Sequence, residues 1–337
     1  MPFEKEDPGG LQSEITLMKQ RLSGFETKIG RLHGLSYSPR SNDVGISTTP
    51  KAGTTWVQQI CHQLRCAAVG KTEKEECMGF EEISAVVPWI ELAYDQGQDL
   101  AADQTPHDPR LPRFFKTHCW YDHCPPFPKT IVVLRDPHDV VLSFYRFFEG
   151  WFFAPGSITL DAFAEEFWLG RGVPDDSKMQ NASYFVHLVS WYQRAVIEAN
   201  NDRKILLVCF EDLKADLPKA TQKIARFISN EFYNFDREDI IRHAVEHSTF
   251  AFMKEHESHF DEHLSKASRN EACGLPKDAG MLKTKINTGR ADGKRAAVSH
   301  HIKRRIDEVW TKVVLPVTGC ATYDELRESI NSKYNDI

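Results

Sequence analysis

Apolar residues near the start of the chain recur every three or four positions, and this spacing predicts an amphipathic helix. About three heptads of this kind is near the minimum for a coiled coil. Residues 1–36 are therefore expected to form a helical extension that either docks on the rest of the chain or pairs in a homodimer, with 37–42 as the linker. The apolar positions are Leu11, Ile15, Met18, Leu22, Phe25, Ile29 and Leu32.

Three strand-like runs follow, at 43–49, 130–134 and 204–210, and each precedes a segment with helical spacing, at 55–69, 140–148 and 219–228. Continuous apolar strands that alternate with helices predict a parallel sheet covered on both faces. We therefore expect one α/β domain over 37–337. Ligands of such sheets bind at the carboxyl ends of the strands, where Thr49 and Arg135 fall.

The composition fits a globular protein. Of the 337 residues, 41% are hydrophobic and 27% are charged, which argues against disorder and repeat arrays. No run approaches the roughly 18 to 20 apolar residues of a membrane span, and the N-terminus lacks an apolar secretory core. The 8 cysteines are scattered, which favours reduced thiols. We expect a cytoplasmic protein without a membrane span.

Charge is concentrated late in the chain. The net charge is −6, yet residues 283–305 carry eight Lys or Arg residues against one Asp. One basic segment in an acidic protein favours a local anion site over a nucleic-acid surface, so no nucleic-acid partner is expected. A solvated basic helix would look the same.

The stretch TTPKAGTTW at 48–56 carries the strongest chemical signal. A strand that stops at a Pro-Lys-Ala-Gly turn and opens a helix directs backbone N–H groups, hydroxyls and one ammonium at a single point, which suits a phosphate. It is not a Walker A loop, because Thr54 follows Gly53 where that motif has Lys. A plain strand-to-helix turn is the alternative.

Arg135 and Ser143 form a second candidate anion site. An Arg at the end of a strand and a Ser two turns into the next helix can converge on one phosphate. A structural ion pair of Arg135 with Asp136 or Asp139 is the alternative. Two phosphate sites on neighbouring strands would suit a ligand that is phosphorylated at both ends.

Between these sites lies the sequence FKTH at 115–118. His118 could act as a general base at neutral pH, with Lys116 neutralising developing charge. A single histidine is more often structural, so this motif needs support from its context.

Other motifs along the chain supply this support. The motifs PKAGTTW, FKTH, IVVLRDPHDVVLSFY, FEDLKADLPKATQKIARFI, HSTFAFMK and a late Gly-rich basic loop occur in that order. Over residues 43–316 the chain resembles the cytosolic-type sulfotransferases that use 3′-phosphoadenosine 5′-phosphosulfate (PAPS). The resemblance implies a P-loop-like α/β domain and in-line transfer of the sulfonate to a hydroxyl or amine of a small-molecule acceptor. The implied reaction leaves PAP as its product and requires no metal.

The resemblance also implies roles for individual residues. His118 would be the catalytic base, with Lys116 beside the transferred sulfonate and Lys51 as a further catalytic group. The first loop, with Lys51, Gly53, Thr54 and Thr55, would bind the 5′-phosphate. Arg135, Ser143 and the late loop would hold the 3′-phosphate, and aromatic residues the adenine. The expected cofactor-binding residues are Lys51, Ala52, Gly53, Thr54, Thr55, Trp56, Arg135, Ser143, Phe210, Phe250, Gly289, Arg290 and Lys294.

Three departures from the family pattern stand out. Ala52 replaces the usual Ser, Phe210 replaces the usual Tyr, and the late loop reads NTGRADGKR. Losing the Tyr hydroxyl would cost about 1 kcal/mol of binding. The assignments in the late loop depend most on the resemblance.

Two other functions stay open from the residues alone. An ATP-dependent kinase or NTPase also needs a phosphate loop. A non-catalytic metal-binding or interaction protein could use the crowded His118, Cys119, His123 and Cys124, or the histidines at 256, 259 and 263. The acceptor is not defined by the sequence, and candidates for its pocket are Trp89, Trp120, Tyr145, Phe147, Phe148, Trp151, Phe152 and Phe153.

Overall fold

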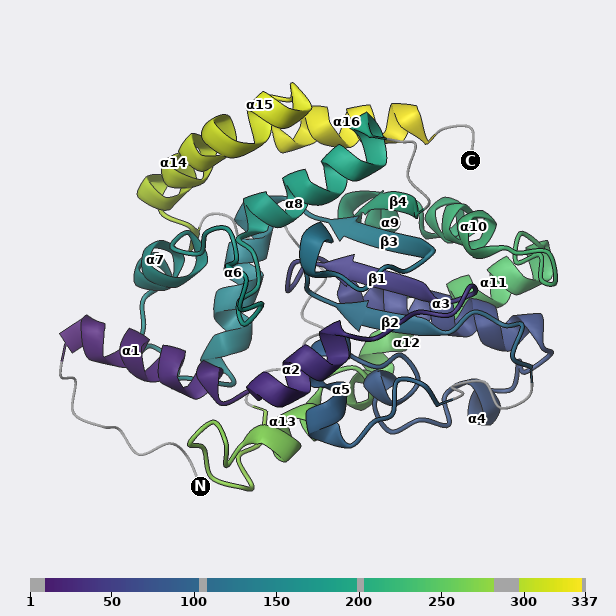
Figure 1. Ribbon diagram of the computed structural model, residues 1–337, viewed down its shortest axis with the longest axis horizontal. Helices are drawn as coiled ribbons and strands as arrows, with labels where there is room; N and C mark the ends of the chain where they lie inside the picture. Colours follow the sequence, from purple (N-terminus) through teal and green to yellow (C-terminus); the bar gives the residue numbers. More distant parts are fainter. Residues whose placement is uncertain (1–9, 103–107, 199–202, 282–296, 335–337) are drawn as a thin grey trace.

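The computed structural model describes residues 10–102, 108–198, 203–281 and 297–334. Four parallel strands lie at its centre in the order β2-β1-β3-β4 (Figure 1). Their bounds are β1 (Val44–Thr48), β2 (Phe114–Thr117), β3 (Lys129–Leu134) and β4 (Lys204–Cys209). This sheet, flanked by helices, confirms the predicted α/β class.

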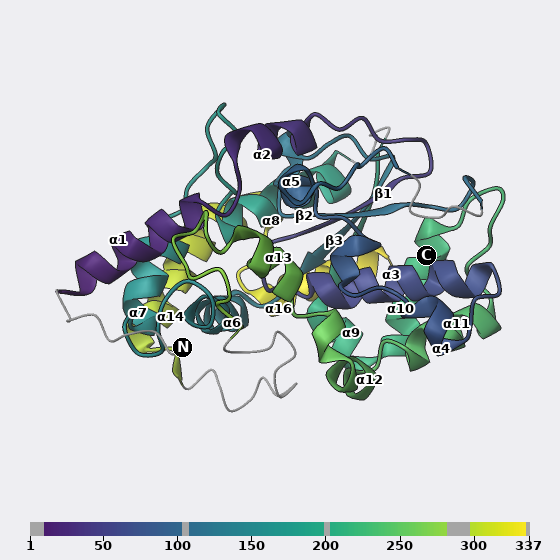
Figure 2. The ribbon, with the colours of Figure 1, turned by 90° about the horizontal axis from the view of Figure 1, so that it is seen from below.

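Helices cover both faces of the sheet, as the view in Figure 2 shows. One face carries α3 (Thr54–Ala68), α10 (Leu217–Ile228) and α11 (Glu238–Glu246), and the other carries α8 (Tyr184–Tyr192). The remaining elements are α1 (Gly10–Ser23), α2 (Lys28–Leu35), α4 (Lys74–Cys77), η1 (Ile83–Ala85), α5 (Ile90–Ala93), η2 (Tyr94–Gln96), η3 (Tyr121–His123), α6 (Pro137–Glu149), α7 (Leu160–Phe163), η4 (Ala164–Trp168), η5 (Gln193–Ile197), α9 (Phe210–Ala215), α12 (Phe250–Glu255), η6 (Glu257–His259), α13 (His263–Arg269), α14 (His300–Val309), η8 (Trp310–Val314), α15 (Leu315–Thr318) and α16 (Tyr323–Lys333).

Local sequence signals set where the helices after the strands begin. The Asp136 side chain accepts a hydrogen bond from the His138 backbone N–H, and Pro137 occupies the first turn of α6. Asp216 caps α10 in the same way, again with a proline in the first turn. A capping carboxylate followed by proline fixes the start of a helix because both groups suit its unpaired N–H end.

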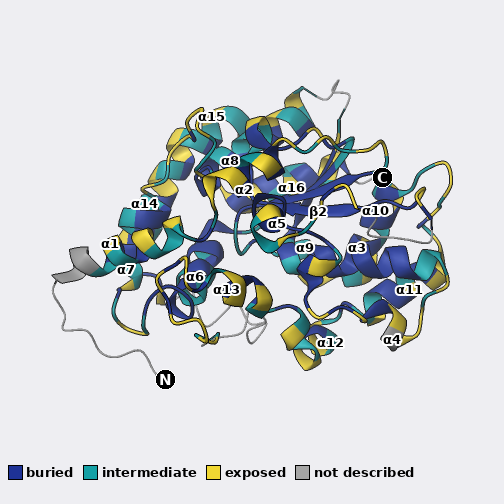
Figure 3. Cartoon of the chain, turned by 60° about the horizontal axis from the view of Figure 1, so that its bottom comes forward, coloured by how far each residue is buried: buried dark blue, intermediate teal, exposed yellow. Residues whose placement is uncertain are grey.

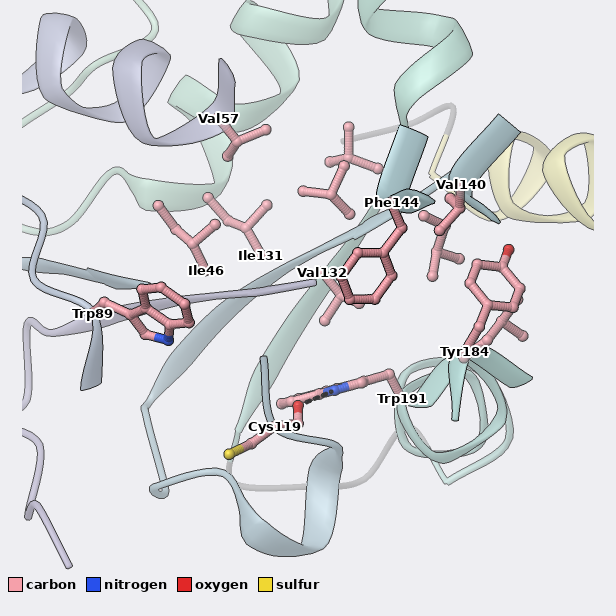
Figure 4. Packing of buried hydrophobic residues seen from close by; sticks show 14 of the residues in the cluster. Ile46, Val57, Trp89, Cys119, Ile131, Val132, Val140, Phe144, Tyr184 and Trp191 are labelled. Atoms are coloured by element: carbon pink, nitrogen blue, oxygen red, sulfur yellow. Dashed lines mark hydrogen bonds between the residues drawn. The ribbon is translucent and has the colours of Figure 1, made fainter. Parts of the chain in front are cut away.

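The core lies on both sides of the sheet. Figure 4 shows Val57 of α3 over Ile46 and Ile131 on one side, and Trp191 and Tyr184 of α8 on the other. Exposed residues gather on the outer faces of the peripheral helices, as Figure 3 shows for α12 and α14. Burial on both faces explains why β3 and β4 are largely apolar, and β1 is buried as well although it carries Ser47 and Thr48.

The N-terminal segment differs from the single helix that the heptad spacing predicts. It forms two helices, α1 and α2, because the Thr27 side chain caps α2 by accepting from the Gly30 N–H while its own N–H and hydroxyl bind the Asp95 carboxylate. The break also moves Ile29 off the apolar face, where it is 71% exposed. Leu11 lies outside the side chains that the structure describes.

The apolar face of α1 is already covered within this chain. Ile15 and Met18 are fully buried, and α1 lies beside α7. The segment therefore docks on its own chain, which was one of the two expected outcomes.

The sequence also missed a strand. Residues 114–117 form β2, which pairs with β1 from Val44 to Ser47. Its run is only four residues long and includes Lys116, so it carries no apolar stretch that would reveal it. In the part of the chain that the structure describes, no helix has both the length and the apolar character to cross a bilayer.

Packing of α2 on α5 should be sensitive to one added methyl group. A Cβ at Gly34 would lie 1.9 Å from the Ile90 carbonyl oxygen, and that backbone cannot move without displacing α5. We expect Gly34→Ala to lower the free energy of unfolding by about 1 to 3 kcal/mol, measured by urea denaturation. Gly172→Ala is the matched control, because a Cβ there meets nothing within 4 Å, and it should change stability by less than about 0.5 kcal/mol. Equal stability of the two variants would contradict the packing of α2.

Candidate active site

Each strand of the sheet is followed at once by a residue that the sequence analysis selected. The phosphate-type loop follows β1, His118 follows β2, Arg135 follows β3 and Phe210 follows β4. The strands begin level, since Val44 pairs with Phe114 on one side and Lys129 on the other. Their carboxyl ends therefore meet around one cavity of about 660 Å³.

The loop after β1 has the backbone of an anion cradle. Lys51 and Gly53 both adopt positive φ, at 75° and 109°. A Cβ at Gly53 would also come within 2.7 Å of the Phe210 ring, so only glycine fits there. Gly53 caps α3 without a side-chain hydrogen bond. The first N–H groups of α3 and its dipole are therefore available to a bound anion.

Arg135 is held at the edge of this cradle. Its guanidinium lies 4.4 Å from the centre of the Phe210 ring, and Nη1 donates to the Lys51 carbonyl at 3.1 Å. Burial lowers the pKa of Arg135, against the opposing effects of Asp139 and Glu211. Its Nε is buried with no hydrogen-bond partner among the described residues. A planar, desolvated cation with a donor still to satisfy suits a phosphate.

His118 is fixed in one tautomer. Its Nδ1 lies 2.9 Å from the Thr48 carbonyl oxygen, which can only accept, so Nδ1 carries the proton. The backbone N–H of His118 donates to Glu91 Oε1 at 2.7 Å, and the Trp89 ring packs edge-on at 5.0 Å. The lone pair is therefore on Nε2, the nitrogen a general base needs.

Lys116 reaches the same cavity from β2. Its Nζ lies 3.6 Å from the centre of the Trp89 ring and forms a buried ion pair with Glu262. Glu262 precedes α13 and itself lines the cavity. Sequence reasoning missed Glu262, since no motif links it to the Lys116 segment 146 residues away.

Aromatic rings border the cradle. The Trp56 and Phe210 ring centres are 5.5 Å apart, and the Trp56 indole donates to the Ser248 carbonyl at 2.7 Å. Phe250 begins α12 and is 44% exposed at the cavity edge. The Lys51 ammonium lies over the Phe147 ring at 4.1 Å.

The structure thus brings together most of the predicted site residues. Ala52 is fully buried in the loop, and Gly289, Arg290 and Lys294 lie outside the described residues. Those that line the cavity are Lys51, Gly53, Thr54, Thr55, Trp56, Lys116, His118, Arg135, Ser143, Phe210 and Phe250.

The rest of the cavity is largely aromatic. Of the acceptor-pocket candidates, Trp89, Phe147, Phe148 and Phe152 line it. Trp120, Tyr145, Trp151 and Phe153 are not among the described residues that line it.

The N-terminal segment forms part of the cavity wall, which the sequence analysis did not foresee. Leu22, Phe25 and Glu26 line the cavity, and the Phe25 ring lies 5.5 Å from Trp89. Burial raises the pKa of Glu26, although its ion pair with Arg31 opposes the shift. The only signal in the sequence was the place of Phe25 on the apolar face.

The two groups considered as alternative metal sites do not form a cluster of metal-type ligands among the described residues. Cys119 donates to Glu91, and the His123 ring packs edge-on against Trp120. The histidines at 256, 259 and 263 bind three different oxygen acceptors, those of Phe252, Phe80 and Asp261.

Comparisons with known proteins agree on one family. Residues 41–312 match the family model for the sulfotransferase domain. The mouse sulfotransferase 1 family member D1 is 29% identical over 232 residues, which cover 66% of this chain and 70% of the relative. The rabbit amine sulfotransferase is 30% identical over 221 residues, which cover 64% of each chain.

Two solved structures share the fold. Retinol dehydratase in complex with retinol and PAP superposes with a TM-score of 0.61 at 18% identity, covering 94% of this chain and 98% of that one. A mouse sulfotransferase in complex with PAP gives 0.58 at 17% identity, covering 93% and 95%.

The buried pair of Lys116 and Glu262 should behave as one unit. Removing either partner alone, by Lys116→Met or Glu262→Leu, leaves a buried charge without its counter-charge and should cost about 3 kcal/mol of stability. The double variant Lys116→Met/Glu262→Leu should lose much less than the sum of the two. Urea unfolding of all four proteins measures the coupling, and simple additivity would contradict the pairing.

Proposed function

The chain belongs to the sulfotransferase family, and on that premise we propose that its cavity binds PAPS and that His118 is the general base for sulfonate transfer to a small-molecule acceptor. One observation carries the proposal. A phosphate-type loop, a guanidinium and an imidazole with its lone pair on Nε2 follow adjacent parallel strands and face one cavity. The match to the sulfotransferase domain favours sulfonate transfer over the kinase alternative.

The two anion sites suit the two ends of PAPS. The 5′-phosphate would bind the loop of residues 51–55 at the start of α3, and the 3′-phosphate would bind Arg135 and Ser143. Two of the solved structures with this fold hold PAP, which supports this cofactor. Gly289, Arg290 and Lys294 stay our proposal for completing the 3′-phosphate site.

The adenine would pack among Trp56, Phe210 and Phe250. Trp56 is held by its hydrogen bond to Ser248, so its ring is placed before the nucleotide arrives. Phe210 also stacks on the Arg135 guanidinium, so one ring can support both the base site and the 3′-phosphate site. A phenylalanine offers the stacking surface without a hydroxyl, which costs about one hydrogen bond.

The transfer step balances with groups on this chain. The acceptor proton moves to His118 Nε2 as the acceptor oxygen or nitrogen forms its bond to sulfur. The bond from sulfur to the bridging oxygen breaks, and its electron pair stays on the 5′-phosphate. Lys51, Lys116 and the N–H groups of α3 stabilise that charge, so the step requires no metal.

The acceptor side favours a small, largely apolar molecule with a hydroxyl or amine. Trp89, Phe147, Phe148 and Phe152 supply apolar wall. The rabbit relative is named for amine substrates, and two solved structures of the fold hold retinol or androsterone. We propose 37–337 as the catalytic domain, with 1–36 contributing Leu22, Phe25 and Glu26 to the acceptor wall.

Two further expectations from the sequence stay predictions. A homodimer would have to use a surface other than the covered face of Ile15 and Met18. A cytoplasmic location is consistent with the 8 cysteines, all of which are buried thiols outside any disulfide.

Arg135→Ala should separate the two phosphate sites. Because Arg135 would pair with the 3′-phosphate, we expect PAP to bind at least tenfold more weakly, while adenosine 5′-phosphosulfate, which lacks that phosphate, loses little affinity. Calorimetric titration with both ligands measures the difference. Arg226→Ala, a surface Arg paired with Asp236, serves as control and should change neither affinity. Equal losses for both ligands would mean that the two phosphates are assigned to the wrong sites.

His118→Ala should impair turnover without impairing nucleotide binding. Loss of a general base typically lowers kcat by about a hundredfold or more, and PAP affinity should stay nearly unchanged. His123→Ala is the matched control, because His123 packs on Trp120 and is not among the cavity-lining residues. Full turnover in His118→Ala with the fold intact would move the base to another residue.

A further inference from the structure

Three side chains of the kind that bind metal ions meet away from the active-site cavity, where α4 ends beside α11. Cys77, His243 and His247 each offer one donor atom, and these atoms lie within 4.8 Å of one another. Cys77 and His243 are buried and His247 is half-buried. The catalytic mechanism uses none of them.

The spacing and the tautomers suit metal binding. His243 and His247 are four residues apart, so one helix face presents both rings, and these stack at 4.1 Å. His247 Nδ1 donates to the His243 carbonyl at 2.9 Å, which leaves the lone pair on Nε2. Each histidine of a metal site typically donates its other N–H to an oxygen in this way.

Gln63 of α3 fixes the tautomer of the His243 ring. Gln63 Nε2 donates to the Cys77 carbonyl at 3.2 Å, so its Oε1 faces His243 Nε2 at 3.0 Å as an acceptor. His243 therefore carries its proton on Nε2 and its lone pair on Nδ1. One glutamine thus holds both the cysteine and the histidine, as a residue outside the ligand shell of a zinc site does.

We propose that Cys77, His243 and His247 bind one thiophilic divalent cation of the zinc type. Sulfur with two imidazole nitrogens is a zinc-type donor set, and bond lengths of about 2.0 to 2.3 Å require donors about 3.3 to 3.8 Å apart. On binding the cation, the three donor atoms would move closer to one another by about 1 Å. The Cys77 thiol releases its proton on binding, and a water completes the tetrahedron.

The role of such a cation is structural. Gln59 of α3 donates to the His247 carbonyl at 2.9 Å, and Trp56 donates to the neighbouring Ser248 carbonyl. A cation that joins α4 to α11 would therefore support the segment that places Trp56 and leads into Phe250. It takes no part in the transfer step, and this inference does not depend on the proposed function.

Cobalt(II) is the probe, because a thiolate ligand gives it a charge-transfer band and tetrahedral geometry gives it strong visible absorption. The full chain, treated with chelator and then titrated with Co²⁺, should develop both features at about one ion per chain. Zinc should displace the cobalt and raise the Tm. A wild-type chain that binds no cobalt, or binds it without a thiolate band, overturns the proposal.

Two variants and two controls assign the ligands. Cys77→Ser should lose the thiolate band, and His247→Gln should weaken cobalt binding by at least tenfold. His256→Gln is the matched control, since His256 also donates Nδ1 to the carbonyl four residues before it, at 2.8 Å. Cys66→Ser, at a thiol 3.5 Å from His62, controls for other cysteines.

Both controls should keep the band. Loss of the band in Cys66→Ser but not in Cys77→Ser would place the ion elsewhere and overturn the assignment. The zinc-induced rise in Tm gives a second readout for each variant. It should disappear in Cys77→Ser and persist in His256→Gln, and a rise that persists in Cys77→Ser also overturns the proposal.

Discussion

The level alignment of four parallel strands is the constraint on which the site depends. Backbone pairing of Val44 with Phe114 and Lys129, and of Lys129 with Lys204, starts the four strands level, and because all are short their ends lie at the same edge. The loop of residues 49–53, His118, Arg135 and Phe210 therefore reach one edge of the sheet from segments far apart in the chain. A slip of one residue in any pair would turn its side chains to the opposite face and remove a group from the cavity.

Contacts at that edge make the groups interdependent. The Lys51 carbonyl accepts a hydrogen bond from Arg135, and the Thr48 carbonyl accepts one from His118. Gly53 leaves room for the Phe210 ring, which stacks on Arg135. The backbone of the loop thus positions both the imidazole and the guanidinium. The loop reaches this arrangement with positive φ at two residues that are separated by Ala52, namely Lys51 and Gly53.

The sequence predicted the parts of the fold that carry recognisable strand runs and clear helix starts. It located β1, β3 and β4 within a residue at either end, and it selected the described groups at all four strand ends. It missed β2, because four residues that include a buried lysine give no apolar run. It also missed parts of the cavity wall that depend on contacts between distant segments, such as Glu262 with Lys116 and Phe25 with Trp89. No local sequence pattern marks these contacts.

Transfer from doubly labelled PAPS tests the central claim most directly. The chain would be incubated with PAPS that carries labelled sulfur and labelled phosphorus, a chelator, and a panel of phenols, alcohols and amines. The account predicts that the sulfur label moves to an acceptor while both phosphorus atoms remain in PAP. Phosphorus label in an acceptor, or no release of PAP with any member of the panel, would contradict it.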